Sequence, residues 1–419
     1  MKKRLAVGVP AIATVLSIGL PIWFDMPGPP AALRQDGPAQ ISAYLASAVD
    51  QGDLPGVVAL VVNRERVLYH EAFGTLNAAQ KVAMPKDAIF QIASMTKPLT
   101  SMAIMRLVAE GKLDVDDEVS RYVPGLANPQ VITSFDGESG TYETRAATRP
   151  ITIRQLLTHT SGIAYTFSNP ALAVAAKATG FNDPIRLPLV HEPGERWAYG
   201  ASTRVLGMVV EKVSGQTLDV FLAERVLHPL GMQETTFEVP RSKYARVVTT
   251  HQRMADGSLP ERPNPATLPV TVQGDGGLYS TAADYARFVQ MLVHEGRLGQ
   301  TRHLETGTVH QMTRNQMGDV VVQTQPSTIP ALSKPFPAGA GADTWGFGFQ
   351  ITAAASTKPT LRRPGSYNWA GIYNTHFWVD PKAEIGVVFL TQVLPFYDER
   401  VMQTLQGFEE LVYRHLADE

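Results

Sequence analysis

Apolar residues follow two different spacings near the start of the chain. From residue 39 to residue 49 they recur at helical intervals, which predicts an amphipathic helix. Residues 56–63 instead form a continuous β-branched run, and residues 67–73 form a second run after a short charged turn. This arrangement predicts a β-hairpin whose first strand is buried on both faces. Another apolar stretch predicts a helix that begins at Ser94 and ends near Gly111.

Helical patterns dominate the middle of the chain. Thr152 has the chemistry of an N-cap for a helix over residues 153–159. Thr281 and Asp284 resemble a capping box, with Asp where Glu is preferred. Further helices are predicted at residues 204–213, 218–227 and 281–295. No strand signal of comparable strength interrupts this region, and two stretches rich in Gly, Pro, Ser and Thr predict long surface loops at residues 135–147 and 315–343.

Strand patterns return near the C-terminus, where short aromatic or β-branched runs are separated by turns. These strands are predicted at residues 346–352, 367–373, 375–379 and 385–391. A terminal amphipathic helix is predicted over residues 398–416. Because strands occur at both ends with helices between them, we expect one sheet assembled from both termini, with an all-helical insertion beside it.

Composition narrows the classes of function. The 419 residues are 44% hydrophobic, and the net charge is −2. The chain can therefore bury a sizeable core, and it has no basic pattern typical of nucleic-acid binding. It contains no cysteine, which excludes disulfides, thiolate zinc sites, a cysteine nucleophile and a lipoprotein anchor. We expect a small molecule as its partner, and no nucleic acid.

The N-terminus has the pattern of an export signal. Lys2, Lys3 and Arg4 precede an uncharged stretch over residues 5–24. This pattern predicts a secretory signal or an uncleaved membrane anchor, and hence a periplasmic or secreted protein. Residues 1–37 are thus expected to be a signal or anchor plus a linker, and whether the segment is cleaved stays open.

Ser94 and Lys97 form the most informative pair in the chain. Ser94 is the only serine with a lysine three positions later, and residues with this spacing share a helix face. A serine needs an adjacent base to become a nucleophile, and a desolvated lysine can be that base. The pair therefore predicts a serine nucleophile, although the same spacing also occurs in solvated helix starts.

Four segments resemble, in the same order, the motifs of the serine β-lactamase and penicillin-binding-protein superfamily. They are residues 90–97, 153–162, 193–200 and 276–281. The resemblance extends from residue 39 to the C-terminus and favours the class C β-lactamase branch, especially the family VIII carboxylesterases.

This resemblance implies an α/β (α+β) fold of two parts, which we expect to form one catalytic domain over residues 38–419. An antiparallel sheet built from both chain ends and flanked by helices would occupy residues 38–95 and 340–419. An all-helical part would occupy residues 96–339.

The resemblance also implies roles for individual residues. Ser94 would be the nucleophile, and Tyr199 the general base and acid, with Lys97 lowering the pKa of Tyr199 and orienting Ser94. Whether Lys97 or Tyr199 takes the proton is open. Residues 369–372 align with the position where β-lactamases carry Lys-Thr-Gly and family VIII esterases carry Trp-Gly-Gly. By this resemblance, the backbone N–H groups of Ser94 and Ile372 would form the oxyanion hole.

Two departures from the β-lactamase pattern bear on the substrate. Trp369 stands where a β-lactamase places a lysine that holds the substrate carboxylate, and Ala201 stands where an asparagine is usual. Both losses favour a neutral, partly apolar ester. We expect its acyl chain to be short to medium in length. The expected substrate-binding residues are Trp369, Ala370, Gly371, Tyr165, Trp345 and Phe347.

Other functions remain as alternatives on the same residues. β-Lactamase, DD-peptidase, amide hydrolase and acyltransferase activities would use the same nucleophile, and a non-catalytic penicillin-binding-like scaffold is the alternative from another class. The chain lacks Gly-x-Ser-x-Gly and His-Glu-x-x-His, which argues against an α/β-hydrolase and a metalloprotease. We expect no metal or cofactor, and structural roles for His159 and His376.

Overall fold

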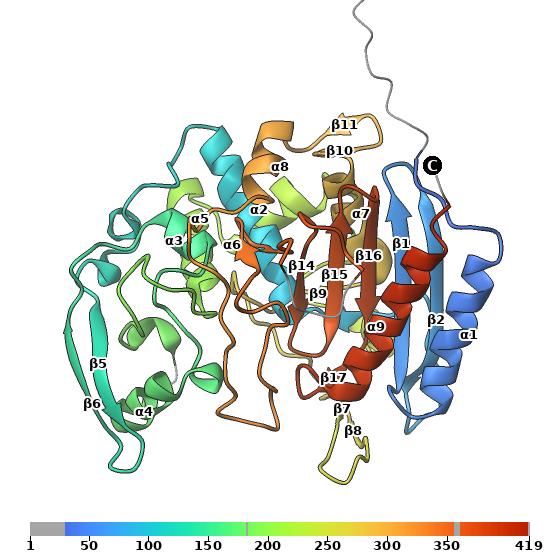
Figure 1. Ribbon diagram of the computed structural model, residues 1–419, viewed down its shortest axis with the longest axis horizontal. Helices are drawn as coiled ribbons and strands as arrows, with labels where there is room; N and C mark the ends of the chain where they lie inside the picture. The colour runs from blue at the N-terminus through green and yellow to red at the C-terminus, as the bar shows by residue number, and fades with distance from the viewer. Residues whose placement is uncertain (1–29, 182, 356–360, 418–419) are drawn as a thin grey trace, which may run out of the picture.

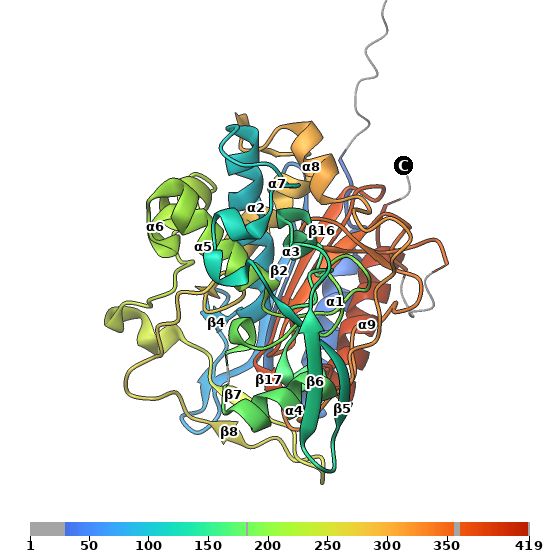
Figure 2. The same ribbon diagram turned by 90° about the vertical axis from the view of Figure 1, so that its left-hand side faces the viewer.

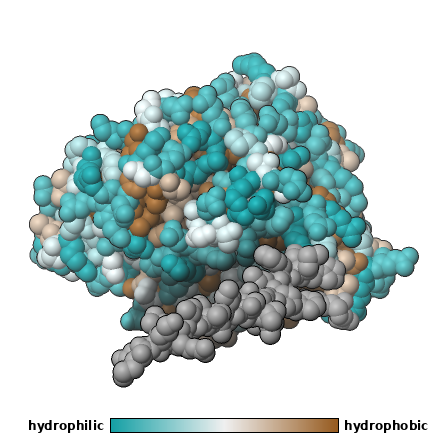
Figure 3. All heavy atoms as spheres, turned by 90° about the horizontal axis from the view of Figure 1, so that it is seen from above, coloured by the Kyte–Doolittle hydropathy of each residue, from teal (hydrophilic) through white to brown (hydrophobic). Residues whose placement is uncertain are grey.

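The computed structural model describes residues 30–181, 183–355 and 361–417. The predicted signal or anchor over residues 5–24 lies outside these described ranges. Within them, no helix has both the length and the apolar character needed to span a bilayer. The face seen in Figure 3 is mainly hydrophilic, with hydrophobic residues gathered in a smaller patch on the side of the helical part.

An eight-stranded antiparallel sheet forms the centre of the molecule (Figure 1), in the order β12-β13-β14-β15-β16-β1-β2-β3. Its middle joins the two chain ends, because β1 pairs with β16 in a register that places Leu60 opposite Val388. The predicted sheet from both termini is confirmed. The strands are β1 (Gly56–Asn63), β2 (Val67–Asn77), β3 (Val82–Ala83), β12 (Thr344–Trp345), β13 (Gln350–Ile351), β14 (Tyr367–Gly371), β15 (Thr375–Asp380) and β16 (Ile385–Leu390).

Strand β1 is buried along its whole length because helices cover both faces of the sheet. Its residues alternate between two cores, as the pleat of a strand requires. Val57, Ala59 and Val61 lie in one core with residues of α1 (Gly37–Asp50) and α9 (Glu399–Arg414). Val58, Leu60 and Val62 lie in the other core with residues of α2 (Thr96–Ala109) and α7 (Ala282–Val293). Figure 1 shows α1 and α9 in front of the sheet and α7 behind it.

Of the remaining helices, α3 to α6 lie on one side of the sheet, in blue-green to yellow-green in Figures 1 and 2, while α8 lies near β10 and β11 and is drawn in orange. At the start of α3 the Thr152 hydroxyl accepts the Gln155 N–H, and the Gln155 side chain accepts the Thr152 N–H, so the predicted cap is a full capping box. The helices outside the sheet-covering set are α3 (Ile153–Leu157), α4 (Pro170–Thr179), α5 (Ser202–Ser214), α6 (Leu218–Leu222) and α8 (Thr306–Met312).

Two predictions for the middle of the chain are wrong. Residues 135–147 were expected to form a loop, but β5 (Gln130–Asp136) and β6 (Thr141–Ala146) pair as an antiparallel hairpin. Most of their side chains are exposed, so the hydrophobic alternation that marks a half-buried strand is weak here. In addition, α7 packs against β1, β15 and β16, so the sheet-bearing part extends into the region assigned to the helical insertion.

Short strands tie distant loops together around the helical part. Strand β4 (Phe90–Gln91) pairs with β9 (Tyr279–Ser280), which brings the residues before Ser94 beside those that follow Asp275. Residues 315–343 are largely irregular, as predicted. The other short strands are β7 (Thr250–Gln252), β8 (Glu261–Arg262), β10 (Arg297–Leu298), β11 (Thr301–Arg302) and β17 (Val393–Leu394).

Candidate active site

Ser94 lies in a short 3-10 turn, Ala93–Met95, that leads directly into α2. Lys97 lies three residues on, in the first turn of α2, so its side chain is on the same face as that of Ser94. The Lys97 Nζ lies 2.9 Å from the Ser94 Oγ. Ala93, immediately before the serine, has a φ of +44°, a strained conformation for a residue with a Cβ. The turn thus holds the serine hydroxyl against the amine.

The Lys97 side chain is buried, and this burial has a larger effect on its pKa than the neighbouring charges have. Its Nζ also lies 2.8 Å from the backbone oxygen of Asp275 and 3.2 Å from the Tyr165 hydroxyl. Desolvation lowers the pKa of Lys97 to about 7, while Asp275 opposes this shift and Arg204 adds to it. The amine is therefore partly neutral near pH 7, as a general base must be.

Tyr199 lies on the other side of the serine. The Trp369 indole Nε1 donates a hydrogen bond of 3.0 Å to the Tyr199 hydroxyl. Burial raises the pKa of Tyr199 well above its usual value, and hydrogen bonds from Ser94 and Trp369 only partly oppose this shift. The Lys97 Nζ faces the Tyr199 ring, 4.8 Å from its centroid. The expectation that Lys97 lowers the pKa of Tyr199 is thus not met, and the phenol is protonated at neutral pH.

A buried ion pair, which the sequence did not reveal, supports this arrangement. The Asp275 carboxylate accepts hydrogen bonds from the Arg204 Nε and Nη2, at 3.1 and 3.2 Å. It also accepts the Tyr165 hydroxyl at 2.5 Å. Asp275 lies in the turn that precedes β9, and Arg204 lies in the first turn of α5. The sequence offered one indication of these residues, which is that Arg204 and Asp275 lie close along the chain to segments that resemble family motifs.

A cavity of about 260 Å³ opens beside Ser94. Ser94 and Ile372, the two expected oxyanion donors, both line it. Ser94 and Ile372 thus border the same space, and their role as oxyanion donors stays a prediction. The remaining lining residues are Gln91, Ala93, Tyr165, Arg204, Pro269, Thr271, Gln273, Asp275, Gly276, Gly277, Leu278, Tyr279 and Tyr373.

Most of the expected substrate-binding residues lie elsewhere. Trp345, Phe347, Trp369 and Ala370 are buried, at 0%, 2%, 3% and 6% exposure, and they do not line the cavity beside Ser94. Of the six, Tyr165 does line it. Their apolar side chains fill the core instead, which is the commoner fate of large aromatic residues.

The buried aromatic residues surround Tyr199. The centroids of the His159 and Trp369 rings lie 4.9 and 4.8 Å from that of Tyr199. Trp345 packs against Trp369 in turn, with the ring centroids 4.5 Å apart. Burial holds the pKa of His159 well below its usual value, so this histidine is a neutral packing residue. These rings fix the orientation of Tyr199 and exclude water from its far side.

Gly371 serves a packing role that the sequence did not indicate. A Cβ at this position would lie 2.3 Å from the backbone oxygen of Ile92 and 2.3 Å from the Thr375 Oγ1. The glycine therefore lets β14 approach the backbone that precedes the nucleophile, rather than opening space for substrate. Among the described residues, no group of three or more acidic or histidine side chains is arranged to hold a metal ion.

Comparisons with known proteins agree with this geometry. A family model described as Beta-lactamase matches residues 41–409. Protein Rv1367c of Mycobacterium tuberculosis is 34% identical over 380 residues, which cover 84% of this chain and 89% of the relative. Esterase EstB of Burkholderia gladioli is 29% identical over 392 residues, which cover 84% of this chain and 90% of the relative. Other matched proteins include esterases and acyltransferases.

A solved structure of a mutant simvastatin synthase from Aspergillus terreus superposes on the chain with a TM-score of 0.78 at 26% identity. The match covers 91% of this chain and 95% of that one. The fold class and the superfamily expected from the sequence are therefore confirmed, whereas membership of family VIII stays a prediction.

Proposed function

The chain belongs to the Beta-lactamase family, and on that premise we propose that it is a serine hydrolase that cleaves carboxylic esters through an acyl-enzyme on Ser94. The observation that carries the proposal is the contact of the Ser94 hydroxyl with the Lys97 amine at a cavity that Ile372 also lines. The preferred acyl chains are short to medium in length, in keeping with the small volume beside the serine.

In the first half of the proposed reaction, the Ser94 Oγ attacks the ester carbonyl and passes its proton to the neutral Lys97 amine. Lys97 is the better acceptor because burial lowers its pKa to about 7, whereas burial raises that of Tyr199. The backbone N–H groups of Ser94 and Ile372 stabilise the oxyanion. Tyr199 then protonates the departing alkoxide, and the Lys97 ammonium returns a proton to Tyr199.

In the second half, water attacks the acyl-enzyme and gives its proton to Lys97. The carbon–oxygen bond to Ser94 breaks, the acid leaves, and the serine oxygen recovers the proton. The two halves use the same groups in opposite directions, as an acyl-enzyme mechanism requires.

The charges around the cavity support an ester over a β-lactam. A β-lactam carboxylate needs a free cation, and Trp369 occupies the position of the usual lysine. Arg204 lines the cavity, but it is already paired with Asp275 and, at 3.4 Å, with Asp183. Ala201 also lacks the amide that would bind a substrate side-chain amide. A neutral substrate fits these residues better than an anion.

The test compares hydrolysis of p-nitrophenyl acetate, butyrate, octanoate and palmitate with hydrolysis of nitrocefin, in the unchanged protein and in Ser94→Ala. We expect butyrate or octanoate turnover to exceed nitrocefin turnover, and Ser94→Ala to abolish both. Ester hydrolysis that survives Ser94→Ala would disprove the nucleophile. Nitrocefin turnover well above ester turnover would instead favour a β-lactamase.

Acyl transfer is a second candidate, because acyltransferases occur among the matched proteins. The same acyl-enzyme would pass its acyl group to an alcohol in place of water. Adding increasing concentrations of butanol to the p-nitrophenyl butyrate assay distinguishes the two. Butyl butyrate as the main product at millimolar alcohol would favour a transferase, while butyrate as the main product supports the hydrolase.

Export of the protein is also a proposal, based on the charged and apolar N-terminal sequence. The N-terminal mass of the protein recovered from a producing cell tests it. A mass that begins after residue 24, in the fraction outside the cytoplasm, supports a cleaved signal, whereas a full-length membrane-bound chain supports an anchor.

A further inference from the structure

The Lys97 amine donates to two acceptors. One belongs to Asp275, and the other is hydrogen-bonded to the Asp275 carboxylate. One is the backbone oxygen of Asp275 itself, at 2.8 Å. The other is the Tyr165 hydroxyl, at 3.2 Å, whose own proton goes to the Asp275 carboxylate. Since a phenol has a single proton, the Tyr165 oxygen can only accept from Lys97. Asp275 thus determines the direction of both hydrogen bonds.

These two hydrogen bonds determine where the lone pair of the neutral Lys97 amine points. A neutral amine has two N–H groups and one lone pair in a tetrahedral arrangement. When both N–H groups point to Tyr165 and to the Asp275 backbone oxygen, the lone pair points toward the Ser94 Oγ, 2.9 Å away. A lysine without these acceptors would rotate freely about its long side chain, and the lone pair would seldom meet the serine.

Arg204 holds Asp275 in place. The Asp275 side chain is 3% exposed, and the Arg204 guanidinium contacts both of its oxygens. A buried carboxylate that lost this partner would be left uncompensated, so the pair is needed to keep the charge in the core. Both residues border the cavity beside Ser94, and the Asp275 carboxylate accepts the Tyr165 hydroxyl.

We propose that Arg204 and Asp275 are positioning residues, which fix Tyr165 as a hydrogen-bond acceptor and thereby aim the lone pair of Lys97 at Ser94. The inference rests on the proposed function, since it concerns the base of the same acylation step. It extends the catalytic set of Ser94, Lys97 and Tyr199 with a buried ion pair that the chemistry depends on but does not consume.

The charges of the pair act on Lys97 in opposite senses. The titratable groups that face Lys97 from the surrounding segments are Asp275, Arg204, Tyr165, Tyr199 and His159. The two tyrosines and the histidine are neutral near pH 7, because burial raises the pKa of the phenols and lowers that of the imidazole. Asp275 favours the ammonium form and Arg204 disfavours it, so removing each should move the titration of Lys97 in the opposite direction.

The experiment measures the rate at which a fluorophosphonate probe labels Ser94, as a function of pH, by intact and peptide mass spectrometry. The probe reports serine reactivity without any choice of ester. The Ser94 oxygen forms a bond to phosphorus, the phosphorus–fluorine bond breaks, fluoride leaves, and the serine proton passes to Lys97. In the unchanged protein the rate should rise as the pH passes about 7, the pKa of Lys97.

Asp275→Asn should move this rise to lower pH, and Arg204→Gln should move it to higher pH, each by about one pH unit. Arg204→Lys keeps the charge and should leave the rise near its original pH. Asp275→Asn and Tyr165→Phe should also lower the plateau rate by about 10- to 100-fold, because the amine is no longer aimed. Tyr165→Phe provides this test even if Asp275→Asn does not fold.

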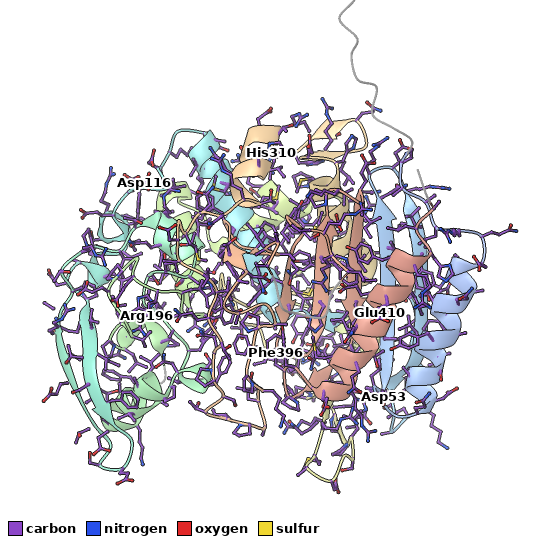
Figure 4. All side chains as sticks on the ribbon, viewed as in Figure 1. Asp53, Asp116, Arg196, His310, Phe396 and Glu410 are labelled. Atoms are coloured by element: carbon purple, nitrogen blue, oxygen red, sulfur yellow. The ribbon has the colours of Figure 1, made fainter. Side chains whose placement is uncertain are left out.

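Asp398→Asn is the matched control, since Asp398 forms a similar buried pair away from the site. The Arg253 Nε and Nη2 contact its carboxylate at 3.1 and 3.3 Å, and Arg253 also donates to the backbone oxygen of Asp53. Asp53, labelled in Figure 4, lies at the lower end of α9, far from the helical part. This variant should lower the thermal midpoint without moving the pH at which labelling rises.

The results distinguish a failure of the positioning role from a failure of the proposed function. Labelling that shifts in the same direction in Asp275→Asn and Arg204→Gln, or that shifts equally in Asp398→Asn, would overturn the positioning role alone. Unchanged labelling in Tyr165→Phe would do the same. No labelling of Ser94 in the unchanged protein would overturn the proposed function itself, together with the positioning role.

Discussion

The two faces of the central sheet bury charged groups in different ways. On the face covered by α1 and α9, each buried cation that we describe has a carboxylate partner, as in Arg253–Asp398 and Arg362–Glu409. On the face toward α2, the Lys97 amine is equally buried, yet none of the described carboxylates lies within ion-pair distance of it. A carboxylate partner favours the charged form of a buried cation, whereas the amine without one loses its proton near neutral pH and becomes reactive.

The contrast extends to two tryptophans on neighbouring strands. Trp369 of β14 faces α2, and its indole N–H donates to Tyr199. Trp378 of β15 faces α9, and its indole N–H has no hydrogen-bond partner among the described residues. One indole thus belongs to the candidate site and the other only to the core.

The largest expected effect comes from replacing the reactive amine. Lys97→Met keeps the shape of the side chain but removes the base, so kcat/KM for p-nitrophenyl butyrate should fall by about 100- to 10,000-fold. The thermal midpoint should rise, because a methionine needs no desolvation of a charge. Steady-state kinetics and thermal unfolding check both results. A variant that loses stability along with activity would show that Lys97 is structural, and the contrast between the faces would fail.

A smaller effect is expected at the two tryptophans. Trp369→Phe removes the hydrogen bond to Tyr199 and should lower kcat about tenfold with little change in KM. Trp378→Phe is the matched control, and it should lower the thermal midpoint while kcat stays unchanged. Kinetics at saturating ester and thermal unfolding of both variants give the comparison. Equal losses of kcat in the two variants would mean that core packing, rather than the Tyr199 hydrogen bond, limits the reaction.

The smallest effect concerns stability as a function of pH. Burial lowers the pKa of Lys97 from 10.5 in its ordinary state to about 7 in the folded protein. Between these values the unfolded chain binds the extra proton, so the free energy of unfolding should rise with pH. Lys97→Met lacks this term, and its advantage in thermal midpoint should therefore shrink from pH 7 to pH 10. An advantage that stays constant over this range would show that the amine is charged in the folded state.

Local patterns in the chain predicted much of the fold because their causes are local. The β-branched run over residues 56–63 can be satisfied only by burial on both faces, and Thr152 caps a helix with groups three residues away. The hairpin over residues 130–146 was missed because its strands are held mainly by backbone pairing, with few buried side chains to mark them. Four of the six expected substrate-binding residues are buried in the core, and the sequence did not reveal this because the burial of an aromatic side chain is decided by its neighbours in space.

By itself, the sequence determined the pair Ser94 and Lys97, since three positions on one turn bring a hydroxyl and an amine together whatever surrounds them. It also determined the superfamily, through four segments that resemble the family's motifs and occur in the family's order, and the family model that matches residues 41–409 agrees. Only the tertiary structure decided what state the amine is in. Asp275, Arg204 and Tyr165 are brought to Lys97 by the pairing of β4 with β9 and the packing of α5 on α2. Hydrogen-bond direction and desolvation depend on these contacts in space, and they have no counterpart in the spacing of residues along the chain.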